Sequence, residues 1–375
     1  RATVKRGADD EGPHRPSVDM TAAGNRTRGG LYGLAAAALF GISLPLTKLL
    51  LPESGPLLIA GLLYLGAGIG LLCFELVVYR HSKVARREAP IHPTDRWLLT
   101  GIVVAGGILG PVLMLWGLQR LSAVASSLLL NLEAPLTIAL AILFFREHLD
   151  RREVLGAIVI IGAAAVLNYH PGTVRTDWLG FVAIVGACLC WAIDNNLSQR
   201  LSLRDPIVVT RIKTLGAGAC TLSLAILTGQ SLPRPSMLMA ALVLGLFSYG
   251  LSLVLDMQAL RLVGAAREAG YFATAPFIGA VAAVPIVGEQ WGSTELASSA
   301  AMAVGVTLLL RAHHRHLHVH EEVEHNHTHV HCEHHQHEHE EQIVTEESHA
   351  HAHRHLPLAH DHPHVSELHH RHEHG

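Results

Sequence analysis

Most histidines of this chain lie in its last 65 residues, where they alternate with other residues. Of the 29 histidines, 24 fall between Arg311 and Gly375, and many form His-x-His patterns. Neutral imidazole is a common protein ligand for zinc, nickel and copper, and glutamates among the histidines add carboxylate ligands. We therefore expect the tail to bind a metal ion, with zinc, nickel, cobalt and copper as candidates. The predicted ligands are His314, His316, His318, His320, His325, His327, His329, His331, His335, His337, His339, His349, His351, His353 and His355.

Four roles are compatible with such a tail. It could buffer or sense metal, deliver metal for export through the rest of the protein, act as a pH-responsive polyelectrolyte because imidazole titrates at about pH 6.5, or be inert. The tail is too polar to fold alone, so we predict that it is disordered without metal. The rest of the chain is not expected to require a cofactor.

The rest of the chain has the composition of a membrane protein. Half of all residues are hydrophobic and 16% are charged, whereas soluble domains carry about 25% charged residues. Apolar segments of about 20 residues recur, which is the length that a helix needs to cross the hydrocarbon core. We predict an all-α membrane protein without a cleavable signal peptide. Its ten transmembrane helices are expected at residues 31–51, 57–79, 97–117, 122–145, 153–168, 178–199, 206–228, 236–257, 266–287 and 294–311.

Positive charge alternates between the two sides of these helices. The poorer side carries Arg120, Arg175 and Arg234 in its loops. The richer side carries Arg26, Arg28, Arg80, Lys83, Arg86, Arg87, Arg96, Arg146, Arg151, Arg152, Arg200, Arg204, Arg261, Arg267, Arg311 and Arg315. The positive-inside rule makes the richer side cytoplasmic. Because ten is an even number, both termini and the tail are then predicted to be cytoplasmic.

The two halves of the helical region repeat one pattern. Arg120-Leu-Ser-Ala-Val-Ala is followed by Pro135, and Arg261-Leu-Val-Gly-Ala-Ala is followed by Pro276 at the same distance. We therefore divide the chain into a polar segment 1–30, a first repeat 31–170, a second repeat 178–311 and the tail 312–375. Five helices per repeat is an odd number, so the repeats must be inverted in the membrane. Inverted repeats are typical of alternating-access transporters.

These segments resemble the EamA family of the drug/metabolite transporter superfamily. The resemblance covers about residues 31–311 and includes both repeats. It is carried by Gly117-Leu-Gln-Arg-Leu-Ser-Ala-Val-Ala-Ser-Ser, Pro135, and Phe145-Arg-Glu-His-Leu leading to Gly156 and Gly162. The second repeat departs from the pattern, since Gly288-Glu-Gln-Trp is a weaker form of the glutamate motif. The resemblance implies a ten-helix transporter of the bacterial inner membrane, of a family that often exports amino acids or other small metabolites.

Several polar residues lie within the apolar segments and are candidates for substrate binding or ion coupling. Ionisable groups inside a membrane are costly and usually face a cavity or a partner. Glu133 lies two residues before Pro135, which frees a backbone carbonyl, and either Glu133 or Asp194 could carry a proton during the cycle. The alternative is that both carboxylates only pair with neighbours for packing. The candidates are Glu133, Asn131, Asp194, Asn195, Asn196, Arg211 and Lys213.

Simpler interpretations are available for five basic or acidic positions. Arg211 and Lys213 could bind an anionic substrate or neutralise Asp194, or they could extend to the membrane surface. Lys48, near the end of the first helix, is expected to extend to the surface as well. Glu147 and Glu289 end helices in the family pattern, so we interpret them as structural.

The sequence contains no phosphate-binding loop, nucleophile elbow or His-Glu-x-x-His motif, and nothing indicates nucleic-acid binding. We predict a transporter rather than an enzyme, with the lipid bilayer, a small-molecule substrate and divalent metal ions as partners. Export of a small metabolite such as an amino acid is the first interpretation. A divalent-metal exporter fed by the tail is the second, and a metal-sensing membrane protein without transport is the third. The sequence leaves the substrate, the coupling ion and a homodimeric state open.

Overall fold

The computed structural model describes residues 20–81, 91–145, 151–168, 177–201, 204–263, 265–311, 314–320, 323–329, 349–355 and 358–364. Glu147 and the predicted metal ligands His331, His335, His337 and His339 lie outside these ranges. All elements between residues 20 and 311 are helices, as predicted for this part of the chain.

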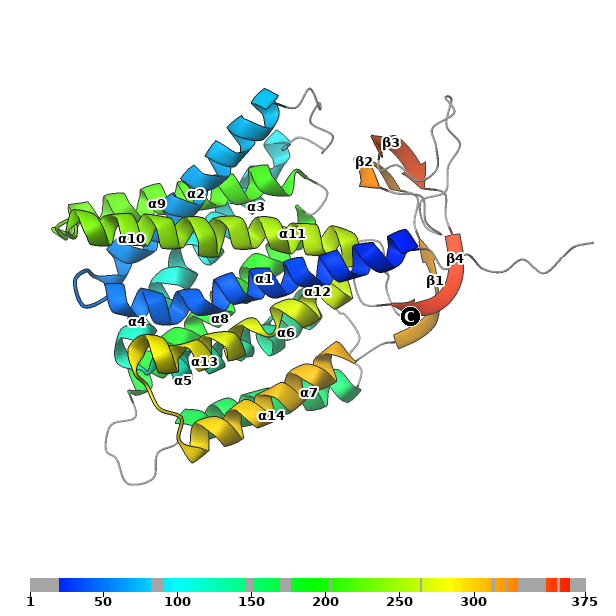
Figure 1. The fold of residues 1–375 in the computed structure, drawn as a ribbon. Coiled ribbons are helices and arrows are strands. Elements are labelled where there is room, and N and C mark those ends of the chain that lie inside the picture. Colours follow the sequence, from blue (N-terminus) through cyan, green and yellow to red (C-terminus); the bar gives the residue numbers. More distant parts are fainter. Residues whose placement is uncertain are drawn as a thin grey trace, which may run out of the picture.

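The helices of the first half run back and forth across the molecule (Figure 1). Their bounds are α1 Met20–Leu50, α2 Pro56–His81, η1 Pro93–Asp95, α3 Arg96–Ile102, η2 Val103–Leu109, α4 Gly110–Arg120, α5 Ala123–Leu129, η3 Leu130–Leu132, α6 Glu133–Phe145 and α7 Arg151–Asn168. We call the end of the bundle where α1 begins the terminal end, and the end where α1 stops the loop end. The terminal end lies on the right in Figure 1.

The second half repeats the order of the first. Its elements are α8 Trp178–Arg200, α9 Pro206–Leu227, α10 Pro235–Gly245, η4 Leu246–Leu251, α11 Ser252–Val263, α12 Ala265–Phe272, α13 Ala275–Val287 and α14 Ser293–Leu310. The helix interruptions recur as well. A π-helical stretch, η2 or η4, divides the third long helix of each half, and a break before Pro135 or Pro276 divides the fourth. Proline lacks a backbone N–H and so weakens the helix there.

Nine helical segments among the described residues are long and apolar enough to cross a membrane. They coincide with nine of the ten predicted helices. The tenth, α7, is a helix of 18 residues that packs along α14. Arg151, Arg152 and Glu153 occupy its first turn, so three charged residues lie within its 18 residues. The tenth crossing therefore remains a prediction.

The outer surface of the bundle carries large apolar side chains. Among the most exposed are Leu31, Leu76, Leu143, Ile158, Leu227 and Val281. Apolar exposure spread over so many helices would be unfavourable in water and is expected where the surface contacts lipid.

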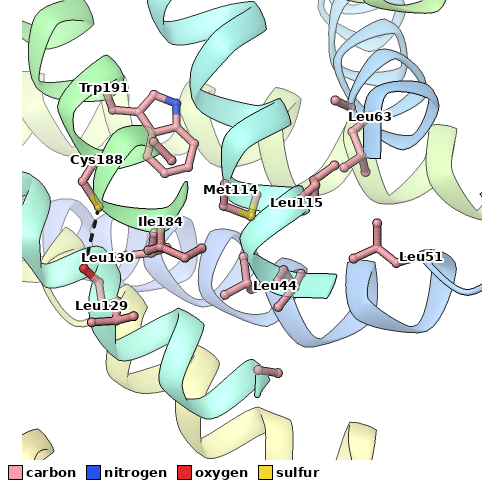
Figure 2. Close-up of a cluster of buried hydrophobic side chains, with 14 of the residues drawn as sticks. Leu44, Leu51, Leu63, Met114, Leu115, Leu129, Leu130, Ile184, Cys188 and Trp191 are labelled. Carbon is pink, nitrogen blue, oxygen red and sulfur yellow. Dashed lines mark hydrogen bonds between the residues drawn. The ribbon is translucent and has the colours of Figure 1, made fainter. Parts of the chain in front are cut away.

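The interior is packed with aliphatic side chains and small residues. Figure 2 shows part of this core, in which Leu44 of α1 and Met114 of α4 lie near Ile184 and Trp191 of α8. The Cys188 thiol donates to the Leu129 carbonyl at 3.7 Å and so links α8 to α5. Glycines permit the closest approaches, as expected for membrane helices. A methyl group at Gly66 would overlap the Leu242 carbonyl, and one at Gly245 would overlap the Leu63 carbonyl.

The tail, for which we predicted disorder without metal, includes four short strands among its described residues. It contains β1 His314–His320, β2 Val323–His329, β3 His349–His355 and β4 Leu358–His364, paired antiparallel as β1 with β4 and β2 with β3. Histidines recur at every second residue, which is the side-chain period of a strand. The register places His327 opposite His351 and His316 opposite His362. The His-x-His pattern that suggested metal ligands is therefore also compatible with paired strands.

Candidate functional site

A cavity with several polar side chains on its walls lies inside the helical bundle, between helices of both halves. Its volume is about 260 Å³, and its walls come from α2, α3, α8, α9, η4 and α11. The polar groups on its walls come from Tyr64, Asp194, Asn195, Ser198, Thr210, Lys213, Thr214 and Tyr249. Since apolar residues fill most of the interior, this group of side chains is the best candidate for a binding site.

An ion pair between α8 and α9 forms one wall of the cavity. The Lys213 ammonium donates to the Asp194 carboxylate, and the Ser198 hydroxyl lies 3.5 Å from the same carboxylate. Only 6% of the Asp194 side chain and 20% of the Lys213 side chain are exposed. Of the three roles considered for Lys213, neutralisation of Asp194 is the one that the structure places here.

The start of α9 determines where Lys213 lies. Asp205 caps this helix, accepting from the backbone N–H groups of Ile207 at 3.0 Å and Val208 at 3.3 Å. Pro206 occupies the first helical position, where its missing N–H costs nothing. Lys213 therefore lies about two turns into α9, at the depth of Asp194.

Glu133 does not line the cavity, but it is hydrogen-bonded to a residue that does. It begins α6, directly after η3, and its carboxylate accepts from the Asn195 side-chain amide at 2.7 Å. Asn195 itself lines the cavity. Four of the predicted residues, Glu133, Asp194, Asn195 and Lys213, are thus brought into one region.

The other predicted residues lie elsewhere. The side-chain amide of Asn131 donates to the Leu128 carbonyl at 2.9 Å, and that of Asn196 donates to the Ala192 carbonyl at 2.8 Å. Each bond joins residues three or four positions apart in the chain. Neither asparagine lines the cavity. Arg211 pairs with Glu75 of α2, on a different face of α9 from Lys213.

Sequence reasoning did not single out Glu75 or the two tyrosines. Glu75 is an acidic residue inside an apolar segment, so the rule that selected Glu133 applies to it equally. The Tyr64 and Tyr249 rings lie 5.5 Å apart, and the Tyr64 hydroxyl donates to the Gly106 carbonyl at 3.0 Å. Aromatic residues are common in membrane helices, and nothing in the sequence distinguishes these two.

Gly106 lies directly behind Asp194. A methyl group at this position would overlap the Asp194 carboxylate. Its carbonyl accepts from Trp191 Nε1 at 3.2 Å as well as from Tyr64. The π-helical stretch η2 therefore helps to position the side chains around the cavity. It leaves room for the Asp194 carboxylate, and its Gly106 carbonyl accepts hydrogen bonds from Tyr64 and Trp191.

Ion pairs join the two halves at the loop end of the bundle. They are Lys48–Glu289, Glu53–Arg234 and Arg120–Asp177. The Arg234 guanidinium, through its hydrogen bonds, holds the pKa of Glu53 below its usual range. Lys48 was expected to extend to the membrane surface, but its ammonium instead contacts the Leu121 carbonyl and Glu289.

The fold and the helices that enclose the cavity are those of a multi-pass membrane protein. The model of the EamA-like transporter family matches residues 27–169 and again residues 178–311. The two matches together cover more than half of the chain, which therefore belongs to this family of the drug/metabolite transporter superfamily. It is a membrane transporter of this type.

Individual proteins agree with this assignment. An uncharacterized transporter of Methanothermobacter thermautotrophicus is 30% identical over 288 residues, which are 74% of this chain and 84% of that protein. A probable amino-acid metabolite efflux pump of Salmonella typhimurium is 25% identical over 178 residues, which are 47% of this chain and 55% of that protein. A solved crystal structure covers 76% of this chain and 98% of its own with a TM-score of 0.56 at 17% identity, a likeness of fold alone.

Proposed function

We propose that this transporter exports a small zwitterionic metabolite such as an amino acid across the bacterial inner membrane, and that the substrate binds in the cavity beside Asp194 and Lys213. The observation that carries the proposal is the buried ion pair on the cavity wall. An efflux pump for amino-acid metabolites among the similar proteins supports the same class of substrate.

A zwitterion suits this site because the wall offers one charge of each sign. Lys213 would bind the carboxylate of the substrate, and Asp194 would bind its ammonium group. Without substrate the two residues neutralise each other, which keeps either charge from being buried alone. The volume of about 260 Å³ is slightly below the range of about 300–1,000 Å³ for typical ligand pockets, so a small solute is favoured.

We further propose that the two halves are inverted repeats that alternate access to this cavity. The packing supports a symmetric arrangement: α1 packs against α11 and α13 of the second half, and α8 packs against α4 and α6 of the first. The remaining helices pair as α2 with α9 and α7 with α14. A binding site between such repeats is the usual position in transporters of this kind.

Transport is proposed to be coupled to protons or driven by the membrane potential. Glu133 is the candidate proton carrier, because its carboxylate is connected through Asn195 to the cavity. Loss or gain of a proton at Glu133 would change its hydrogen bond to Asn195. The Asn195 side chain, which lines the cavity, would then change its position.

The alternative of a divalent-metal exporter receives less support from the cavity. Asp194 is the one carboxylate among its lining residues, which include no histidine or cysteine. Among the described residues, no group of three or more His, Cys, Asp and Glu side chains is arranged to hold a metal ion. We therefore propose the tail as the place of metal binding, with a role in buffering or sensing. A metal sensor that transports no solute would have no need of this cavity.

Transport into everted membrane vesicles tests the proposal. Radiolabelled neutral amino acids should accumulate in vesicles that contain the protein, whereas radioactive nickel and zinc should not. Asp194→Asn should reduce the uptake at least about tenfold, because an interaction with a charged group is worth about 1.5–3 kcal/mol. Arg234→Gln removes a charge at the exposed loop end and serves as the control. Accumulation of metal without amino acids would favour the alternative, and uptake unaffected by Asp194→Asn would contradict the assigned site.

A further inference from the structure

The cavity is closed toward the loop end of the bundle. On that side of Trp191, residues of α1, α4, α5 and α13 leave a space of only about 10 Å³, which holds at most one water molecule. The residues that close it include Phe40, Leu44, Met114 and Ser127. The cavity extends the other way, to Leu201 and Val209 near the terminal end. A substrate in this structure would therefore enter or leave by the terminal end.

Glu289 ties the two halves together beyond this closed region. Its carboxylate accepts from the backbone N–H groups of Ala123 at 2.7 Å and Val124 at 2.8 Å, which are the first two residues of α5. The Lys48 ammonium of α1 lies 3.6 Å from the same carboxylate. One side chain of the second half thus holds two helices of the first.

The contacts of Glu289 complete the start of α5. The first N–H groups of a helix have no partner within it. Ser122 accepts from the N–H of Ala125 at 3.0 Å, and Glu289 accepts from the two N–H groups that precede it. The helix dipole also favours a negative charge at this position. Separation of the halves would leave both N–H groups to water.

The other two bridges at the loop end are weaker candidates for holding the halves together. Side-chain exposure is 36% and 34% for Arg120 and Asp177, and it reaches 71% for Arg234. Exposed pairs contribute little because water screens them. Glu289 and Lys48 are 17% and 23% exposed, and the hydrogen bonds of Glu289 are charge-assisted, which makes them about twice as strong as neutral ones.

We propose that Glu289 is the latch of the gate at the loop end: its contacts with α5 and Lys48 hold that end closed while the cavity is open to the terminal end, and they must break when access alternates. Glu289 is a positioning residue, since it does not line the cavity. The proposal assigns a conformational role to a residue that sequence analysis interpreted as purely structural. It rests on the proposed transport through the cavity.

The test measures access to a buried position instead of transport, so its result does not depend on the substrate. Ser127 is 1% exposed and lies in the closed region. In a background with the five cysteines replaced by alanine, Ser127→Cys is labelled with a membrane-impermeant thiol reagent added at the loop end. Glu289→Gln should raise the labelling rate about tenfold, because strong hydrogen bonds are lost from the closed state alone. Labelling of Ser198→Cys from the terminal end should fall.

Two matched variants complete the experiment. Lys48→Met removes the partner of Glu289 but leaves the cap on α5, so it should raise labelling of Ser127→Cys by a smaller factor. Arg234→Gln removes a charge from the exposed bridge and should leave labelling unchanged. Equal labelling in Glu289→Gln and its parent overturns the proposal. If Glu289→Gln does not reach the membrane, an unchanged rate in Lys48→Met overturns it. If the vesicle assay shows no uptake of amino acids but Glu289→Gln changes the labelling rate, the proposed substrate is wrong and the proposed role of Glu289 stands.

Discussion

At the scale of single residues, the buried pair of Asp194 and Lys213 is the central feature. Both side chains are largely removed from water, and each is neutralised by the other. Breaking such a pair by removing one partner leaves an uncompensated charge, whereas replacing both partners often costs little. The pair therefore constrains stability as well as the proposed transport.

This asymmetry gives a stability prediction. Asp194→Asn and Lys213→Met should each destabilise the protein by about 3–5 kcal/mol, and the double variant should be more stable than either single variant. Thermal unfolding in detergent, measured side by side, checks the order of the three. A double variant less stable than both singles would indicate that the cavity is hydrated enough to solvate either charge alone.

Glu133 offers a separate test of coupling. Glu133→Gln keeps the shape of the side chain and a carbonyl oxygen to accept from Asn195, but it can no longer carry a proton. Proton-driven transport should be lost, while expression and membrane insertion remain normal. Substrate exchange across the membrane, which needs no net proton movement, should persist. Wild-type proton-driven uptake in this variant would assign Glu133 a packing role.

At the scale of elements, the interrupted helices determine the shape of the cavity. Apolar segments of membrane length indicated the helices, because the hydrocarbon core requires them. The choice of partners could not be predicted in the same way. Asn195 contacts Glu133 from 62 residues away, and Val124 contacts Glu289 from 165 residues away. Such pairs depend on how the halves pack, which neither hydrophobic patterning nor spacing specifies. Neutralisation of Asp194 by Lys213 was one of several alternatives.

The glycine in η2 provides the test at this scale. Gly106→Ala places a methyl group against the Asp194 carboxylate, so it should displace Asp194 from Lys213 and reduce substrate transport at least about tenfold, as for the loss of one charged interaction. Gly162→Ala is the matched control, because no atom of the described structure lies within 4 Å of the added carbon. Equal transport by the two variants would show that η2 does not shape the proposed binding site.

At the scale of the whole molecule, we expect the tail and the helical region to have separable roles. Removal of residues 312–375 takes away no predicted membrane helix. The truncated protein should therefore insert and transport amino acids as before, and should lose any response to added metal. Cellular resistance to nickel, cobalt and zinc should be unchanged. Reduced resistance after truncation would favour the metal-export alternative.

The orientation of the whole protein is also open to test. The positive-inside rule predicts that both termini face the cytoplasm. A C-terminal reporter fusion should then show activity of a cytoplasmic reporter. Alkaline phosphatase activity at that position would overturn both the orientation and the even number of membrane crossings.

The π-helical stretch η2 restricts the insertions and deletions that this protein can accept during evolution. A π-helical turn holds one residue more than an α-helical turn, so η2 shifts the phase of α4 against that of α3. Deletion of one residue between Val103 and Leu109 would restore a regular helix and rotate α4 by about 100°. Met114 and Leu115, now buried, would leave the core. Length variation at this site is therefore far more restricted than residue variation, although the segment lies within a continuous apolar helix.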